Sequence, residues 1–284
     1  QEVLANIDKV KKWDKRLFFQ TMCHHFYNDI CGHAKSFTGI TEKVSNQDLG
    51  LNSGFSDLGL KVLHKMLDNT DDRRILIDIK HMSVKARNEY YEILENDYKD
   101  EILPLIVSHG AVTGFRSHDQ KVVDNQHTYG LFNEADINFF DDELVRVAKS
   151  GGLFGIQLDE RRVASKHAIK KAGWRLSRRK MLFHRSKFIW NQIQHIAETL
   201  DRAGLYAWSI QSIGSDFDGL IDPVNGIWGA EEMPLLDAYL EKHAFNYLTS
   251  PLADRLQPFN RVNADEVVER FMHDNAWEFL RRHF

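Results

Sequence analysis

Histidine and aspartate residues follow directly after apolar runs at four places in the chain. These segments are Cys23-His24-His25, Lys80-His81, Ser108-His109 and Gly214-Ser215-Asp216-Phe217-Asp218-Gly219. In parallel α/β folds the carboxyl ends of the strands lie at one edge of the sheet, so we expect these side chains to gather there. Imidazoles from neighbouring strands suit Zn²⁺, which lowers the pKa of a bound water, and a nearby carboxylate can then carry the proton.

Alternating strand and helix patterns predict the elements that position these segments. Short apolar, β-branched runs predict the strands, and apolar residues three or four positions apart predict the helices between them. The expected strands span 17–22, 75–79, 104–107, 153–158 and 208–213, with a long helix from about Ser186 to Arg202. Ser83 is expected to cap the helix after the second strand. This rhythm predicts an α/β fold with a parallel sheet and right-handed crossovers.

Length and charge narrow the class of protein. The chain has 284 residues, and 41 acidic side chains against 37 basic ones give a net charge of −4. This near-balance argues against nucleic acid or a membrane surface as the main partner. No apolar run approaches the roughly 18 residues of a membrane-spanning helix, and no leader pattern opens the chain. We expect a soluble protein without a targeting segment in this sequence. Length alone allows one large α/β domain or two smaller domains, and we expect residues 1–284 to form one α/β barrel domain.

Motifs for two other kinds of chemistry do not occur. No glycine-rich phosphate loop opens a helix, and no Gly-x-Ser-x-Gly elbow supports a serine hydrolase. The two cysteines, Cys23 and Cys31, exclude a disulfide scaffold or a four-thiolate zinc module, and we expect both to be small buried residues. Asp78 lies inside an apolar run, so we expect a buried structural carboxylate or a partner for a ligating histidine.

Three segments are similar to the motifs of one enzyme family. They are Leu76-Ile77-Asp78-Ile79-Lys80-His81-Met82-Ser83, Pro104-Leu105-Ile106-Val107-Ser108-His109 and Ile213-Gly214-Ser215-Asp216-Phe217-Asp218-Gly219. They look like that family's Ile-Asp-Leu-Ser-His-Val-Ser, Pro-Val-Ile-x-Ser-His and Gly-x-Asp-Phe-Asp-Gly segments, in the same order and with similar spacing. On these residues the chain resembles the membrane (renal) dipeptidase family of zinc metallopeptidases, a branch of the amidohydrolase-like TIM barrels.

The resemblance implies a TIM (β/α)8 barrel with a two-zinc site. His81 and His109 fall on the two histidines that bind one zinc, and Asp216 falls on the aspartate that serves the substrate amine and the proton transfer. His24 falls on the histidine that contacts the substrate, and His25 beside it is a second candidate for that role. Members of the family are often dimers, so the resemblance also implies a possible homodimer.

The chain departs from the family in two places. The family's His-x-Asp motif and its metal-bridging carboxylate come before the segment that matches His24, whereas only 23 residues precede His24 here. We therefore expect this chain to cover about the fourth to eighth strand-helix units, to lack the first three strands, and to follow further sequence. The second departure is the arginine run for the substrate carboxylate. Asp136 and Ile137 stand in its place, and Arg116 is the candidate substitute.

The leading hypothesis is a metal-dependent hydrolase that cleaves a small amide or dipeptide bond with a metal-activated hydroxide. Asp216 would carry the proton to the leaving amine. Asp218 is a second candidate, for which we favour a turn-capping role. Trp228, in the loop after the last expected strand, is expected to wall the substrate site. The alternative is a catalytically inactive dipeptidase-like barrel that serves as a binding or structural protein, and another small amide such as a lactam is open as the substrate.

Overall fold

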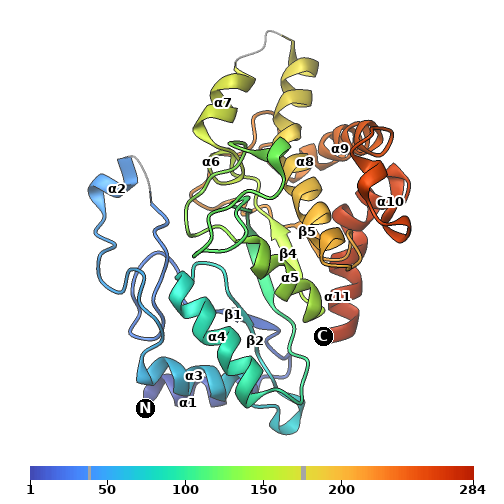
Figure 1. Cartoon of the computed structure of the whole chain (residues 1–284). Helices are drawn as coiled ribbons and strands as arrows, with labels where there is room; N and C mark the ends of the chain where they lie inside the picture. Colours follow the sequence, from blue (N-terminus) through green and yellow to red (C-terminus); the bar gives the residue numbers. More distant parts are fainter. Residues whose placement is uncertain (38–39, 174–176) are drawn as a thin grey trace. The chain divides into compact units, whose positions relative to one another are not determined.

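The computed structural model describes residues 1–37, 40–173 and 177–284, which form two compact units (Figure 1). The first unit comprises residues 1–107 with Phe284, and the second comprises residues 108–283. The expectation of one domain over 1–284 stays a prediction. Among the described residues, no helix combines the length and the apolar character that crossing a membrane requires.

The first unit is built around two parallel strands and the start of a third. Its elements are α1 (Glu2–Lys11), β1 (Phe19–Thr21), α2 (Ile40–Val44), α3 (Asp57–Leu67), η1 (Thr70–Asp72), β2 (Leu76–Asp78), α4 (Val84–Asp97) and the first residues of β3 (Ile106–Gly110). β1 pairs with β2 so that Thr21 lies opposite Asp78, and Asp78 also pairs with Ile106 of β3. Both pairings are parallel, as the sequence predicts.

Serine side chains begin the two main helices of the first unit. Ser56 Oγ accepts a hydrogen bond from Gly59 N at 3.0 Å, and Ser83 Oγ accepts one from Ala86 N at 3.0 Å. The second bond confirms the predicted cap at Ser83. Such caps satisfy backbone donors that the first helical turn leaves without partners. Behind its cap, α3 buries Leu63 and Leu67 completely, and this apolar face packs on β2.

The second unit contains the rest of the sheet and most of the helices. Its elements after β3 are η2 (Gln126–Thr128), α5 (Asp141–Lys149), β4 (Leu153–Ile156), α6 (Glu160–Val163), α7 (Lys166–Ala172), α8 (Arg178–Arg202), β5 (Gln211–Ile213), η3 (Ala230–Glu232), α9 (Met233–Leu248), η4 (Ala253–Arg255), η5 (Pro258–Asn260), α10 (Ala264–Glu269), η6 (Arg270–Asp274) and α11 (Asn275–His283). β4 and β5 pair in parallel, with Ile156 opposite Ile213. Gln157 N donates to Gly110 O at 2.8 Å, which joins β4 to the carboxyl end of β3.

The strand order follows the chain, β1-β2-β3-β4-β5, which confirms the predicted parallel α/β sheet. Closure into an eight-stranded barrel, with the chain as its fourth to eighth units, stays a prediction. All five expected strands have shifted boundaries, and the one expected over 104–107 lies at Ile106–Gly110. Two of the wrong boundaries have a clear physical reason. The strand expected over 208–213 begins at Gln211, because Ala207 N and Trp208 Nε1 donate to Asn260 instead of a strand ladder. The long helix begins at Arg178 rather than Ser186, because its first turns bury Leu182 and the Arg185–Glu160 ion pair.

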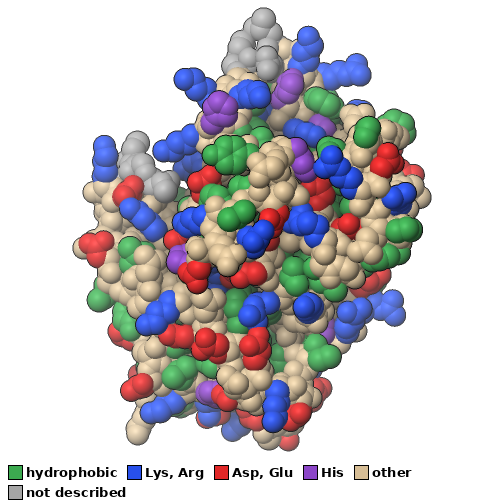
Figure 2. Space-filling view, viewed as in Figure 1, with side chains coloured by type: hydrophobic (Ala, Val, Ile, Leu, Met, Phe, Trp, Pro, Cys, Tyr) green, Lys and Arg blue, Asp and Glu red, His purple; other side chains and the backbone are tan. Residues whose placement is uncertain are grey.

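Acidic and basic side chains are mixed over the face of the molecule drawn in Figure 2. Neither sign gathers into a single large patch on that face, in keeping with 37 basic and 41 acidic residues in the whole chain. The interior is apolar by contrast, with Phe139, Phe154 and Trp190 of the second unit fully buried. α8 packs on α5 and on α9, so it forms the middle of the helical layer in this unit (Figure 1).

Two glycines let three strands of the second unit approach each other closely. A Cβ atom at Gly155 or at Gly214 would lie 2.3 Å from Ser108 O, a backbone atom that cannot move aside cheaply. We predict that Gly155→Ala lowers the free energy of unfolding by about 1–3 kcal/mol, the usual cost of overpacking. Gly229→Ala is the matched control, because its Cβ would meet Glu232 Oε2 at an ordinary 3.8 Å. Urea denaturation followed by circular dichroism measures both, and equal stability of the two variants would contradict the prediction.

His243 makes the stability of the second unit sensitive to acid. It is buried in α9, with Nε2 3.0 Å from Ser186 Oγ and 3.1 Å from Phe183 O. Burial, assisted by the charge of Lys187 and then by His184 and Lys242, lowers the pKa of His243 to about 3. The folded-state pKa therefore lies below the unfolded value, so the unfolded chain binds more protons as the pH falls from about 6.5 towards 3.

We predict that the free energy of unfolding falls with decreasing pH in this window, with His243 contributing up to about 1.4 kcal/mol per pH unit. His243→Gln keeps a polar group beside Ser186 but does not titrate, so its unfolding free energy should fall less steeply. Urea denaturation of both proteins between about pH 4.5 and 7 measures the two slopes. Identical slopes would show that His243 is not the titrating group.

Candidate active site

Three imidazoles lie together in the first unit, at the carboxyl ends of β1 and β2. The ring centroids of His24 and His81 are 4.1 Å apart, those of His24 and His25 are 4.0 Å apart, and those of His25 and His81 are 5.2 Å apart. His81 is 5% exposed and adopts a left-handed backbone conformation with φ 68°. Its carbonyl accepts a hydrogen bond from Ala34 N at 2.8 Å, which holds this turn.

Polar neighbours hold this histidine group in place. His25 Nδ1 lies 2.8 Å from Ser36 Oγ, which also accepts a hydrogen bond from Gln47 Nε2 at 2.8 Å. Asp78, just before the turn, is fully buried and accepts a hydrogen bond from Thr21 Oγ1 at 2.7 Å across the strands. Its other oxygen accepts the Lys80 backbone N–H at 3.1 Å. Asp78 is therefore a buried carboxylate paired with neighbouring groups, as the sequence predicts, and its role as a partner for a ligating histidine stays a prediction.

Both cysteines flank the segment that carries His24 and His25, and both are buried free thiols, as predicted. Cys23 Sγ and Cys31 Sγ lie 3.6 Å and 3.4 Å from the same acceptor, Gly32 O. The hydrogen bond with Cys23 and burial raise the pKa of the Cys31 thiol. A buried thiol that keeps its proton is inert, so Cys31 supplies no thiolate to the histidines.

His109 and Asp216 lie together in the second unit, at the carboxyl ends of β3 and β5. His109 Nε2 is 4.0 Å from Asp216 Oδ2, and the two side chains are 15% and 28% exposed. Ser108 Oγ lies 2.8 Å from the other ring nitrogen of His109. Gln157 Nε2 donates to Asp216 Oδ2 at 2.7 Å. Each of the two side chains is thus oriented by a second residue, and both can be reached by solvent.

Asp218 does not cap the turn after β5 as expected. Gly219 N closes this turn by donating to Asp216 O at 3.0 Å, and Asp218 is exposed with φ 69°. Asp216 has φ 57°, so two aspartates in one short turn adopt the left-handed conformation. Asp and Asn tolerate this region better than other side chains, which is why this turn contains aspartate at both positions.

Two other predicted site residues, Trp228 and Arg116, each contact a residue nearby in the sequence. Trp228 is 60% exposed, and its backbone N donates to Glu232 Oε2 at 3.3 Å. Arg116 forms a two-pronged ion pair with Asp124 inside the loop after β3, at 3.1 Å and 2.5 Å. The roles of Trp228 as a wall of the site and of Arg116 as a carboxylate ligand stay predictions.

Sequence reasoning missed Gln157 and Arg162. Gln157 is buried directly after β4, and a polar residue that closes an apolar strand was a signal that could have marked it. Arg162 is half-buried in α6. Burial lowers the pKa of Arg162, whereas the charges of Asp159 and Asp216 raise it, which puts this guanidinium within electrostatic reach of Asp216.

The predicted metal ligands belong to different units, His81 to the first and His109 to the second. Across the residues that the structure describes, no group of three or more His, Cys, Asp or Glu side chains is placed to hold a metal ion. A structural or catalytic zinc needs at least three protein ligands. The donor types present suit zinc, but the described side chains do not complete a site.

No family model and no curated protein matches the sequence. The structure is similar to a number of solved structures, and the three described next are each 17% identical to it. A metallopeptidase of Rhodobacter sphaeroides, liganded with a phosphinate mimic of L-Ala-D-Ala, has a TM-score of 0.47 over 81% of this chain and 48% of its own. An amidohydrolase of Pseudomonas aeruginosa has 0.49 over 98% and 67%, and the probable dipeptidase PvdM of that organism has 0.49 over 94% and 66%.

The chain thus spans about half the length of the Rhodobacter sphaeroides metallopeptidase. These structural neighbours are named as a metallopeptidase, an amidohydrolase and a probable dipeptidase.

Proposed function

We propose that this protein is a metal-dependent hydrolase that cleaves a small amide or dipeptide bond, with Asp216 carrying the proton. The observation that carries the proposal is the pair formed by His109 and Asp216, whose Nε2 and Oδ2 atoms face each other across 4.0 Å. His109 lies in the last residues of β3 and Asp216 follows β5, so both stand at the strand ends where α/β enzymes place their reactive groups. A structural ion pair would not require this partial exposure or two separate orienting residues.

His109 is oriented to use Nε2. When Nδ1–H donates to Ser108 Oγ, at 2.8 Å, Nε2 carries the lone pair that can bind a metal ion. Hydrogen bonds of this kind fix the tautomer and the ring orientation of metal-binding histidines. Ser108 is therefore the positioning residue for His109.

Gln157 positions Asp216. Its amide donates to Oδ2 at 2.7 Å from the end of β4, the strand that lies between those of His109 and Asp216. This bond fixes the plane of the carboxylate relative to the imidazole. A carboxylate held in this way can take a proton from an attacking water and return it to the leaving amine. Arg162 adds a cation near Asp216 that suits the carboxylate of a dipeptide.

The metal is a separate part of the proposal with its own test. A bound zinc would supply a Lewis acid for the amide carbonyl and an activated water. His81 and His109 would contribute imidazole ligands, and the proposal requires further ligands beyond any group found among the described side chains. His24 and His25 lie against His81 and would face the substrate.

Substitutions in the turn after β5 test the proton-transfer role. We predict that Asp216→Asn lowers kcat on small dipeptides by about 10²–10⁴-fold, the usual contribution of a general acid or base. Asp218→Asn, two residues along in the same turn, is the matched control and should keep kcat within about twofold, because Asp218 is exposed away from His109 and Gln157. Loss of activity in Asp218→Asn but not in Asp216→Asn would reverse the assignment.

Gln157→Leu separates positioning from catalysis. It keeps the approximate volume but removes the donor to Asp216, so we expect kcat to fall by about 10-fold or more while KM changes little. Full kcat in Gln157→Leu would show that the hydrogen bond does not position the carboxylate.

Metal content tests the other half of the proposal without relying on activity. Elemental analysis of the purified protein should find zinc, and the double variant His81→Ala, His109→Ala should lose it. His118→Ala, an exposed histidine of the loop after β3, is the control and should retain the metal. A protein that binds no metal even after zinc is supplied would overturn the metal-dependent mechanism.

A further inference from the structure

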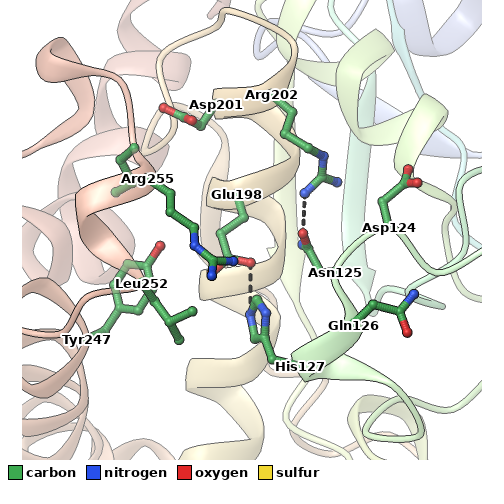
Figure 3. A pocket seen from close by; sticks show the side chains of 11 residues that line it. Asp124, Asn125, Gln126, His127, Glu198, Asp201, Arg202, Tyr247, Leu252 and Arg255 are labelled. Atoms are coloured by element: carbon green, nitrogen blue, oxygen red, sulfur yellow. Dashed lines mark hydrogen bonds and ion pairs between the residues drawn. The ribbon is translucent and has the colours of Figure 1, made fainter.

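A cavity of about 530 Å³ lies in the second unit, and no residue of the candidate active site is among those that line it (Figure 3). The end of α8, the end of α9, the segment around η4 and the loop over 124–127 form its walls. The lining residues that matter below are Glu198, Asp201, Tyr247, Leu252, Arg255 and Leu256. This volume is within the range of sites that bind small organic molecules.

Most charged groups on the wall already have partners. His127 Nε2 lies 3.0 Å from Glu198 Oε2, and Gln194 Nε2 donates to Glu198 Oε1 at 2.9 Å. Asp201 Oδ1 accepts hydrogen bonds from Gln257 N at 2.8 Å and Asn260 Nδ2 at 2.7 Å. These interactions fix the carboxylates of Glu198 and Asp201 in the wall, so a cationic ligand would find few acceptors without partners there.

Arg255 is the exception among the charged groups. Its side chain is exposed and lines the cavity, and within the described residues its guanidinium has no hydrogen bond or ion pair. Figure 3 shows it on the same side of the cavity as Tyr247 and Glu198. A planar guanidinium with five donors is suited to a carboxylate that binds through two oxygens.

Tyr247 supplies a second donor, which lies beside the Glu198 carboxylate without a hydrogen bond of ordinary geometry to any described residue. The residue is 5% exposed, so its hydroxyl is largely shielded from water. Burial, followed by the charge of Glu198 and a hydrogen-bonding interaction with it, raises the pKa of Tyr247, so the hydroxyl keeps its proton at neutral pH and acts as a donor. A buried hydroxyl with a poorly aligned acceptor is costly, and a ligand oxygen in good geometry lowers the cost.

We propose that this cavity binds a small organic carboxylate with an apolar body. The carboxylate pairs with Arg255 and accepts the Tyr247 hydroxyl, and the apolar body packs against Leu252 and Leu256. A phosphate dianion fits less well than a monoanion, because the lining carboxylates of Asp124, Glu198 and Asp201 repel its second charge. Of the two lining arginines, Arg202 is already paired with Asn125 and Asp141, which leaves Arg255 for the ligand. The site is independent of the proposed hydrolase, since none of its residues contacts His109 or Asp216.

Titration calorimetry with 4-methylpentanoate tests the proposal. We expect a Kd in the range of about 0.1–5 mM at neutral pH that weakens as salt is added, because the ion pair is solvent-accessible. The neutral amide 4-methylpentanamide has the same shape without the charge and should bind at least about 10-fold more weakly. Inorganic phosphate should bind more weakly than the carboxylate.

Three variants locate the binding site. Arg255→Gln should raise the Kd at least about 10-fold, and Tyr247→Phe should raise it about 3-fold by removing the hydroxyl alone. Arg281→Gln, an exposed arginine of α11 outside the cavity, is the matched control and should bind as the original protein does. Thermal unfolding of each variant checks that it is folded, which is expected because Arg255 and Arg281 are both exposed.

Four results would overturn the proposal. Equal affinity for the amide would show that no carboxylate is recognised, and unchanged affinity in Arg255→Gln would place binding elsewhere. Tighter binding of phosphate would assign the cavity a different ligand class. Absence of heat up to about 20 mM carboxylate, confirmed by unchanged amide resonances in a two-dimensional NMR spectrum, would mean that the cavity binds no such molecule.

Discussion

The close approach of three strand backbones in the second unit is the constraint on which its candidate site depends. Gly155 and Gly214 both face Ser108 O, and neither position has room for a Cβ atom. Because Gly155 and Gly214 carry no side chain at this level, the carboxyl ends of β3, β4 and β5 lie side by side. His109, at the end of β3, and Gln157 and Asp216, just after β4 and β5, are the residues that this brings together. A bulkier residue at either glycine would separate the imidazole from the carboxylate.

Backbone strain marks the candidate residues in both units. His81 and Asp216 each have positive φ, at 68° and 57°, and each follows the end of a strand. Non-glycine residues in this region cost roughly 1–2 kcal/mol, which persists only where surrounding contacts compensate. The Ala34 N–H holds the His81 carbonyl, and Gly219 N holds the Asp216 carbonyl. Seven non-glycine residues in the described part of the chain have positive φ, and His81 is the one among them that is neither Asp nor Asn, so its conformation is the least expected from residue type.

α8 organises the second unit around that site. Near its start, Arg185 forms a buried ion pair with Glu160 of α6, at 2.7 Å. In its second half, the fully buried His195 lies 2.7 Å from Asp141 at the start of α5. Its last turns form a wall of the cavity that contains Arg255. Breaking one partner of a buried ion pair is usually expensive, so these pairs keep the helix in one register over the sheet. α8 thus holds α6 and α5 in place, and it also forms part of the wall of the separate cavity.

Local sequence patterns determined the elements and the strand ends that carry the chemistry. The cap at Ser83, the buried carboxylate of Asp78 and the parallel strand order could all be predicted, because they depend on nearby residues and on the short apolar runs. The positions of His24, His81, His109 and Asp216 after those runs followed in the same way.

Tertiary structure decided which side chains meet. Gln157 donates a hydrogen bond to Asp216, which lies 59 positions away in the sequence. Asn260 accepts a hydrogen bond from Trp208, 52 positions away, and this contact keeps Trp208 out of the strand. The two donors of the cavity, Arg255 and Tyr247, also lie on separate segments, and no local sequence pattern indicated that they line one cavity. These contacts depend on how helices pack over the sheet, so their partners are set by burial and hydrogen bonding over long sequence separations. Periodicity and motif spacing report only on neighbours along the chain, which is why the sequence located the strand ends but not the residues that orient their side chains.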